Sequence, residues 1–158
     1  MQLITIAVFL GLRWEIFENA IADCKQCLKL NSLYPLGYYN LGLIHLEIGD
    51  LTAALDYFDR SQDLDRKKID TYINRGIVHL KLGNYREAIE DQTVALYLDS
   101  NLAQAYYIRG EALRELEKYQ EAIADFQKAG DICQKLQKAE LAEKAWEAIE
   151  VTKKRARI

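Results

Sequence analysis

The same residue types return every 34 positions through most of this 158-residue chain. Small residues keep the interval in two series: Gly42, Gly76 and Gly110, and Ala20, Ala54, Ala88 and Ala122. Aligned without a gap, the chain divides into four units and a tail: 1–34, 35–68, 69–102, 103–136 and 137–158. A fixed period of this length is the signature of a repeat array, in which each unit packs mainly on its neighbours. We therefore expect one continuous domain over residues 1–158.

Within a unit, the recurring residues follow a helical spacing. In the third unit Tyr72, Gly76 and His79 fall three or four positions apart, and the pattern breaks at Gly83-Asn84 before it resumes. A glycine at such a break can take the left-handed conformation that ends a helix. Each unit is therefore predicted to hold two amphipathic helices joined by a turn.

The tail also has a helical pattern, with Leu141, Ala145 and Ile149 on one face and charged residues on the other. A repeat array needs a terminal element with one polar face to cover its last open surface. We expect residues 139 to about 155 to form this capping helix, followed by a short basic end.

The units resemble the tetratricopeptide repeat. A large aromatic residue, a glycine and an alanine carry the likeness in three units: Tyr38, Gly42 and Ala54; Tyr72, Gly76 and Ala88; Tyr106, Gly110 and Ala122. The first unit is an imperfect repeat that matches in its second half, since Val8 stands where glycine is expected. The resemblance implies an all-α fold, a right-handed superhelical solenoid of antiparallel helix pairs with a C-terminal capping helix.

Glycines at this place suggest a close crossing of the two helices in a unit, because larger residues would force them apart. We expect the alanines of the second helices to face them: Ala54, Ala88 and Ala122.

Two arginine–aspartate pairs share a 16-residue spacing, Arg75 with Asp91 and Arg109 with Asp125. In the second unit the same places hold Leu41 and Tyr57, so a charged pair and an apolar pair exchange together. We therefore predict an ion pair that links the two helices in each of units three and four, where the planar guanidinium can bind a carboxylate through two hydrogen bonds.

The composition restricts the classes of partner. The net charge is −3 and the isoelectric point calculated from the sequence is about 5.5. This acidity argues against binding to nucleic acid irrespective of its base sequence, which needs a basic surface. Three cysteines, an odd number, do not indicate a disulfide framework and fit a reducing compartment, so we expect a cytoplasmic protein.

No residue set in the sequence predicts catalysis. Cys24 and Cys27 form a CxxC motif, but no second ligand pair accompanies it, and both lie where other units have buried-type residues. His45 and His79 stand at a packing place of their units. We find no nucleophile–base pair and no phosphate loop. We predict a protein that is not an enzyme and has no catalytic residue, metal or cofactor.

Function is then expected at the concave face that the first helices of a solenoid present. The residues predicted to line this peptide-binding groove are Tyr39, Asn40, Leu43, Glu47, Ile73, Asn74, Ile77, Lys81, Tyr107, Ile108, Glu111 and Arg114. Asparagine can both donate to and accept from a peptide backbone. We expect an interaction scaffold that binds a peptide segment of a protein partner, with Tyr39, Ile73 and Tyr107 as its anchors.

One subgroup of the resembled family binds the C-terminal carboxylates of heat-shock chaperones through a clamp of lysine, asparagine and arginine. The five matching places here hold Tyr39, Leu43, Asn74, Gln104 and Ile108, of which only Asn74 fits. Chaperone tails are therefore disfavoured as partners.

Two alternatives remain open. The apolar run at residues 3–12 (LITIAVFLGL) is about half as long as a membrane span, so membrane association is not favoured, but it would suit a membrane-docked assembly factor. A helical repeat that binds RNA needs a basic face. That alternative is less favoured, because Glu47, Asp70 and Glu111 lie where the groove is expected.

Overall fold

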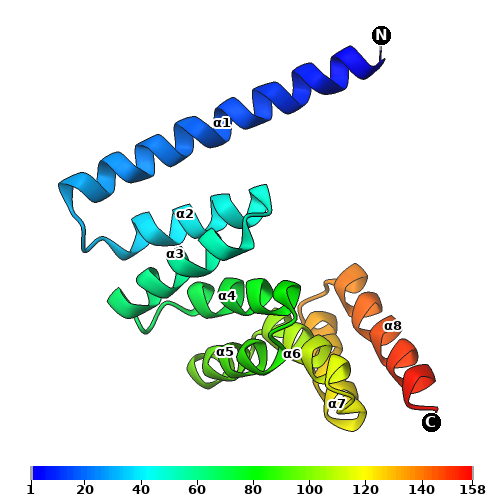
Figure 1. The fold of residues 1–158 in the computed structure, drawn as a ribbon. Coiled ribbons are helices and arrows are strands. Elements are labelled where there is room, and N and C mark those ends of the chain that lie inside the picture. Colours follow the sequence, from blue (N-terminus) through cyan, green and yellow to red (C-terminus); the bar gives the residue numbers. More distant parts are fainter. Residues whose placement is uncertain (1, 158) are drawn as a thin grey trace. The chain divides into compact units, whose positions relative to one another are not determined.

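The computed structural model describes the backbone of residues 2–157 and the side chains of residues 14–157. Every regular element in that part of the chain is a helix (Figure 1). The eight helices among the described residues are α1 (Gln2–Leu30), α2 (Pro35–Ile48), α3 (Leu51–Leu64), α4 (Ile69–Leu82), α5 (Tyr85–Leu98), α6 (Ala103–Glu115), α7 (Tyr119–Lys135) and α8 (Ala139–Ala156). The all-α prediction is confirmed.

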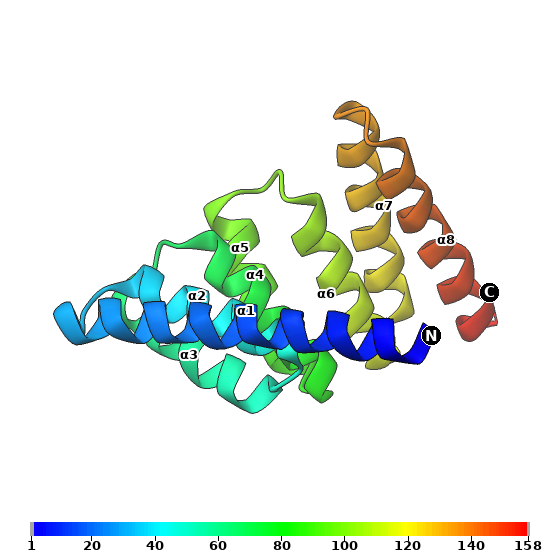
Figure 2. The ribbon, with the colours of Figure 1, turned by 90° about the horizontal axis from the view of Figure 1, so that it is seen from above.

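The chain forms two compact units, 1–66 and 67–158. One continuous domain over residues 1–158 stays a prediction. Residues 1–66 contain α1, α2 and α3, and residues 67–158 contain α4 to α8. Within residues 67–158, α7 packs against both α6 and α8 (Figure 2).

The helix pairs follow the 34-residue spacing. Gly49 (φ 90°) ends α2 and Gly83 (φ 79°) ends α4, both in the left-handed conformation that favours glycine. The turn between α6 and α7 has no glycine, and there Glu117 takes the left-handed conformation at φ 60°. The turn is therefore preserved in the last pair although its glycine is not.

The first 34 residues differ from the expected helix pair. Helix α1 is a single helix of 29 residues that runs through Glu15 and Ile16, the places of the turn residues Gly49 and Asp50. Neither residue favours a helix end. Trp14 Nε1 also donates a hydrogen bond to Glu18 Oε1 at 3.0 Å, one helical turn further on, which stabilises the helix across this point.

The glycines mark close crossings, but their partners are not the expected alanines. A Cβ atom on Gly42 would lie 2.6 Å from the Phe58 ring, and one on Gly110 would lie 2.9 Å from the Phe126 ring. The alanines Ala54, Ala88 and Ala122 are fully buried, yet they are not the nearest atoms to the glycines. The glycine therefore makes room for a large side chain from the second helix.

Both predicted ion pairs are confirmed. Arg75 donates to Asp91 through Nε at 2.9 Å and through Nη2 at 2.5 Å. Arg109 donates to Asp125 through Nε at 2.7 Å and through Nη2 at 2.9 Å. Both aspartates are buried, so each pair joins the two helices of its unit by two charge-assisted bonds.

Helix α8 covers α7. Ala145 and Ile149 are buried. The Trp146 ring packs on Gly130 of α7, where an added Cβ atom would lie only 2.6 Å from the ring. Leu141 differs from the expectation, because its side chain is 47% exposed although it shares their sequence pattern. The capping face of α8 therefore begins at Ala142, which is buried, and leaves out Leu141.

We predict that Asp91→Ala lowers the free energy of unfolding by about 3 kcal/mol, because it leaves the Arg75 guanidinium without its buried carboxylate. The double variant Arg75→Leu/Asp91→Tyr reproduces the apolar pair of the second repeat and should remain within about 1 kcal/mol of the wild type. Urea unfolding followed by circular dichroism measures both.

The matched control is Asp56→Ala, which removes an exposed carboxylate 3.1 Å from Arg60 and should change stability by less than about 1 kcal/mol. Equal losses from Asp91→Ala and Asp56→Ala would contradict a structural role for the buried pair.

Candidate peptide-binding site

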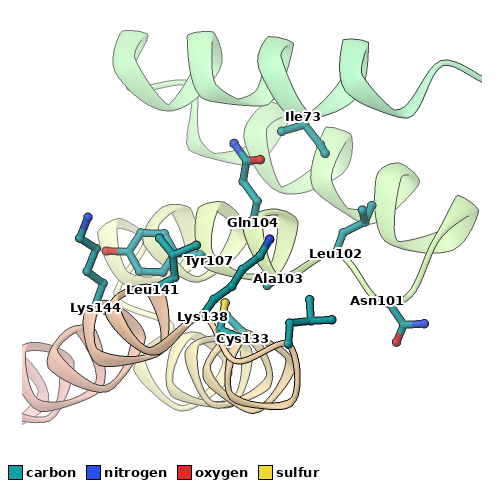
Figure 3. A pocket seen from close by; sticks show the side chains of 12 residues that line it. Ile73, Asn101, Leu102, Ala103, Gln104, Tyr107, Cys133, Lys138, Leu141 and Lys144 are labelled. Carbon is teal, nitrogen blue, oxygen red and sulfur yellow. The ribbon is translucent and has the colours of Figure 1, made fainter.

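A pocket of about 560 Å³ lies within the unit formed by residues 67–158. Its walls come from α4, the start of α6, the end of α7 and the start of α8 (Figure 3). The residues that line it include Ile73, Gln104, Tyr107, Cys133, Lys138, Leu141 and Lys144. We call this cavity the α4–α6–α8 pocket.

Three of its apolar residues occupy one repeat position. Ile73, Tyr107 and Leu141 are 34 residues apart and stand at the same place in α4, α6 and α8. Stacking of successive repeats therefore brings them around one cavity. Ile73 is only 7% exposed and forms a wall, whereas the more exposed Leu141 can be reached by a ligand.

The Tyr107 ring is held by a contact with Phe126, at the point where α6 and α7 cross at Gly110. The Phe126 ring fills the space beside Gly110, and the Tyr107 ring meets it edge-on, with centroids 5.3 Å apart. Burial raises the pKa of the Tyr107 hydroxyl, and the charge of Glu111 raises it further. The hydroxyl therefore stays protonated at neutral pH and can both donate and accept a hydrogen bond.

The pocket is apolar inside and polar at its edge. Lys138 and Lys144 both come from the start of the α8 segment and bring positive charge to the opening, and Gln104 adds an amide from α6 (Figure 3). Lys144 lies 3.8 Å from the exposed carboxylate of Glu140. An apolar interior with a few polar groups at its edge is the usual composition of a ligand pocket.

Charged residues link α6 to α8. Arg114 lies 3.6 Å from both Glu111 and Glu115, and Arg155 donates to Glu115 at 2.7 Å. Burial raises the pKa of the Glu111 carboxyl; Arg114 acts against this rise and Glu115 adds to it. Arg114 also lies over the Phe126 ring, 5.6 Å from its centroid, so these charges help to hold α6, α7 and α8 together.

A model of the tetratricopeptide repeat family matches residues 17–68 and 73–135, which is most of the chain. The chain belongs to the tetratricopeptide repeat family. Heat shock protein STI1 of Saccharomyces cerevisiae is 37% identical over 49 residues, 31% of this chain and 8% of that protein. The match therefore spans only a small part of the relative.

Solved structures show the same fold. The TPR2B domain of yeast Sti1 in its complex with pHsp70 has a TM-score of 0.73 at 18% identity, covering 77% of this chain and 97% of that one. PcrH in complex with the chaperone binding region of PopD has a TM-score of 0.71 at 22% identity, covering 75% and 90%. Proteins of this fold are interaction modules that are typically non-enzymatic.

In this tetratricopeptide repeat protein the predicted groove residues of α4 and α6 are only partly brought together. Ile73 and Tyr107 line the α4–α6–α8 pocket, but Ile108 is 5% exposed and belongs to the core around Tyr72 and Ala105. Its side chain is therefore unavailable to a ligand. The other predicted residues of this unit lie at other points, half-buried or exposed: Asn74, Ile77, Lys81, Glu111 and Arg114.

Within the unit of residues 1–66, the Tyr39 ring lies 5.9 Å from the Phe58 ring, as Tyr107 lies on Phe126. Asn40 and Leu43 are half-buried and Glu47 is exposed.

The third repeat replaces this ring pair with a polar contact. Gln92, at the place of Phe58 and Phe126, is fully buried and donates through Nε2 to the carbonyl oxygens of Tyr72 and Ile73, each at 3.3 Å. A backbone contact therefore fixes Ile73 at the position where the other repeats use an aromatic pair.

Two cysteines and one histidine that the sequence singles out have different surroundings in the structure. Burial raises the pKa of the Cys24 thiol, which disfavours its reactive thiolate. Cys27 is exposed, so it is not the packing residue that its repeat position predicts. His45 lies 3.5 Å from Asp50 and its ring contacts that of Tyr57. No group of three or more metal-ligating side chains occurs among the described residues.

None of the helices in the described part of the chain combines the length and hydropathy that crossing a bilayer requires.

We predict that Glu111→Gln stabilises the protein at neutral pH. A carboxyl with a raised pKa binds its proton more tightly in the folded state, so its ionised form lowers stability above the folded pKa. The advantage of the glutamine should shrink as the pH falls through the titration of Glu111. Thermal unfolding between neutral and acid pH measures it.

Glu150→Gln is the control of opposite sign. A hydrogen bond from Lys153 lowers the pKa of the Glu150 carboxyl, so this substitution should bring no gain at neutral pH. A stability profile of Glu111→Gln that does not change with pH would contradict the buried-carboxylate interpretation.

Proposed function

We propose that this protein is a non-enzymatic scaffold that binds a peptide segment of a partner protein in the α4–α6–α8 pocket. The observation that carries the proposal is the convergence of Ile73, Tyr107 and Leu141 on one cavity of about 560 Å³ with lysines at its opening. The volume suits one large apolar side chain of a peptide together with its neighbouring backbone.

Each part of the pocket has a role in this binding. An apolar peptide side chain would enter between Tyr107 and Leu141, where a ring already held by Phe126 loses little conformational entropy. The amide of Gln104 and the Tyr107 hydroxyl can bond to the peptide backbone. The preferred peptide therefore has an apolar anchor with an acidic residue beside it, attracted by Lys138 and Lys144.

Similar structures support a peptide ligand, since two of them are complexes, one with pHsp70 and one with the chaperone binding region of PopD. A chaperone C-terminal tail remains disfavoured here. Only Asn74 matches the five clamp places, and the place held by Ile108 is buried. The cysteine content favours a reducing compartment, so we infer a cytoplasmic location.

The test is selection of a phage-displayed random peptide library against the intact chain, followed by fluorescence anisotropy with the enriched peptide. We predict a consensus of one apolar anchor and an adjacent acidic residue. Leu141→Ala should weaken binding about tenfold by removing the exposed wall, and Lys144→Glu should weaken acidic peptides further. Ile73 is unsuitable for this test because its burial makes its truncation destabilising.

Val151→Ala is the matched control, since Val151 also lies on α8 and is 46% exposed, close to the 47% of Leu141, but does not line the pocket. If Leu141→Ala and Lys144→Glu bind the selected peptides as tightly as Val151→Ala does, the pocket is not the binding site.

A further inference from the structure

The turn between α1 and α2 (Figure 1) carries a cluster of large apolar side chains that are exposed. Leu30 is 82% exposed and Leu33 70%. Tyr34 and Leu36 are 41% and 38% exposed. We call residues 30–36 the α1–α2 corner. An exposed cluster of this kind marks a contact with a protein or a membrane.

The next turn of the same kind, between α3 and α4, has charges where the α1–α2 corner has none. Five positions of the corner are uncharged, and the residue 34 positions later is charged in every case. The pairs are Asn31 and Asp65, Ser32 and Arg66, Leu33 and Lys67, Tyr34 and Lys68, and Leu36 and Asp70. The repeat fold therefore does not require an apolar surface here, which points to a contact outside the fold.

The α1–α2 corner also forms its turn without a charged side chain. The N–H group of Leu33 donates to Asn31 Oδ1 at 3.1 Å. In the turn before α6, the N–H group of Asn101 makes the same contact with the carboxylate oxygen Asp99 Oδ1 at 2.9 Å. A neutral amide thus takes the place of the carboxylate, and the turn keeps its hydrogen bond without a charge.

Other polar backbone groups of the corner are paired within the chain. The N–H group of Asn31 donates to the carbonyl oxygen of Cys27 at 2.9 Å, and that of Tyr34 donates to the carbonyl oxygen of Asn31 at 3.3 Å. The Tyr38 hydroxyl donates to the carbonyl oxygen of Ser32 at 3.1 Å. Hydrocarbon offers no hydrogen-bonding partner, so a segment enters it at low cost only when such groups are paired internally. A protein partner would usually form hydrogen bonds across the interface, so this pairing favours lipid.

The residues around the corner suit a membrane interface. No Asp, Glu, Lys or Arg occurs from residue 30 to residue 46. Lys25 and Lys29 are exposed one turn apart on α1, just before the corner, and their long side chains can extend to lipid phosphates. Tyrosine is enriched at the level of the lipid headgroups, the place that Tyr34 would take.

We propose that the α1–α2 corner inserts into the surface of a neutral phospholipid bilayer, with Leu30, Leu33 and Leu36 at the edge of the acyl region. The net charge of −3 gives no general attraction to anionic lipids, so the contact depends on apolar insertion. It is distinct from docking through residues 3–12, and it uses none of the residues that line the α4–α6–α8 pocket.

The test is co-sedimentation of the intact chain with phosphatidylcholine vesicles. We expect binding at low salt and also at about 0.5 M salt, which screens charges but not apolar insertion. Leu33→Asp should lower the partition coefficient by about tenfold or more, because it brings a charge to the inserted segment.

Tyr97→Asp is the matched control, since Tyr97 is 89% exposed on α5, outside the corner. This variant should bind the vesicles as the wild type does. Circular dichroism verifies that both variants keep the helical fold.

Fluorescence quenching gives a second readout that locates the inserted segment. Leu33→Trp should be quenched by vesicles of brominated phosphatidylcholine, whereas Tyr97→Trp should not be. Trp14 and Trp146 are present in both variants and contribute the same background.

Absence of vesicle binding by the intact chain would overturn the proposal. Binding that Leu33→Asp leaves unchanged but that deletion of residues 1–13 abolishes would also overturn it, and would assign the membrane contact to residues 3–12. A dimer in light scattering that Leu33→Asp dissociates, without any vesicle binding, would assign the corner to a second copy of the chain instead.

Discussion

The fold depends on the close crossing of the two helices in each repeat. Glycine on the first helix leaves room for one large side chain from the second, Phe58 beside Gly42 and Phe126 beside Gly110. That side chain also packs against a tyrosine of the first helix, since the rings of Tyr39 and Tyr107 lie against it. In the pair of α6 and α7 the contact that joins the helices therefore also holds Tyr107, which lines the α4–α6–α8 pocket.

Much of this arrangement could be predicted from spacing alone. The 34-residue period predicts the helix pairs from α2 to α7, and the joint exchange of Arg75 and Asp91 for Leu41 and Tyr57 predicts a contact between helices. Spacing could not predict which residue faces each glycine. That depends on side-chain direction along the second helix, and it favours Phe58 over Ala54 one turn earlier.

Only some of the residues of the candidate site can be predicted from the sequence. The sequence predicts Ile73 and Tyr107, but it places Leu141 on the capping face because the helical pattern of Leu141 matches that of Ala145 and Ile149. Extending the 34-residue register into the tail would have placed Leu141 with Ile73 and Tyr107, and Lys138 with Gln104. The sequence also predicts Ile108 in the groove, whereas its side chain packs in the core with Tyr72 and Ala105. The spacing of residues does not reveal this contact.

Glu15 and Glu117 show why local sequence does not decide the turn. Both stand where two other repeats have glycine, yet Glu117 is left-handed while Glu15 lies inside a helix. A left-handed glutamate costs roughly 1–2 kcal/mol, so packing has to offset that cost. Around α6 and α7 it does, because Leu113 and Phe126 are buried together and α8 covers them. At α1 the small Cys24 offers less burial than Phe126 does, and helix continuation leaves Glu15 in its preferred conformation. The same residue type at the same repeat position therefore takes two conformations, and the burial around it differs between the two places.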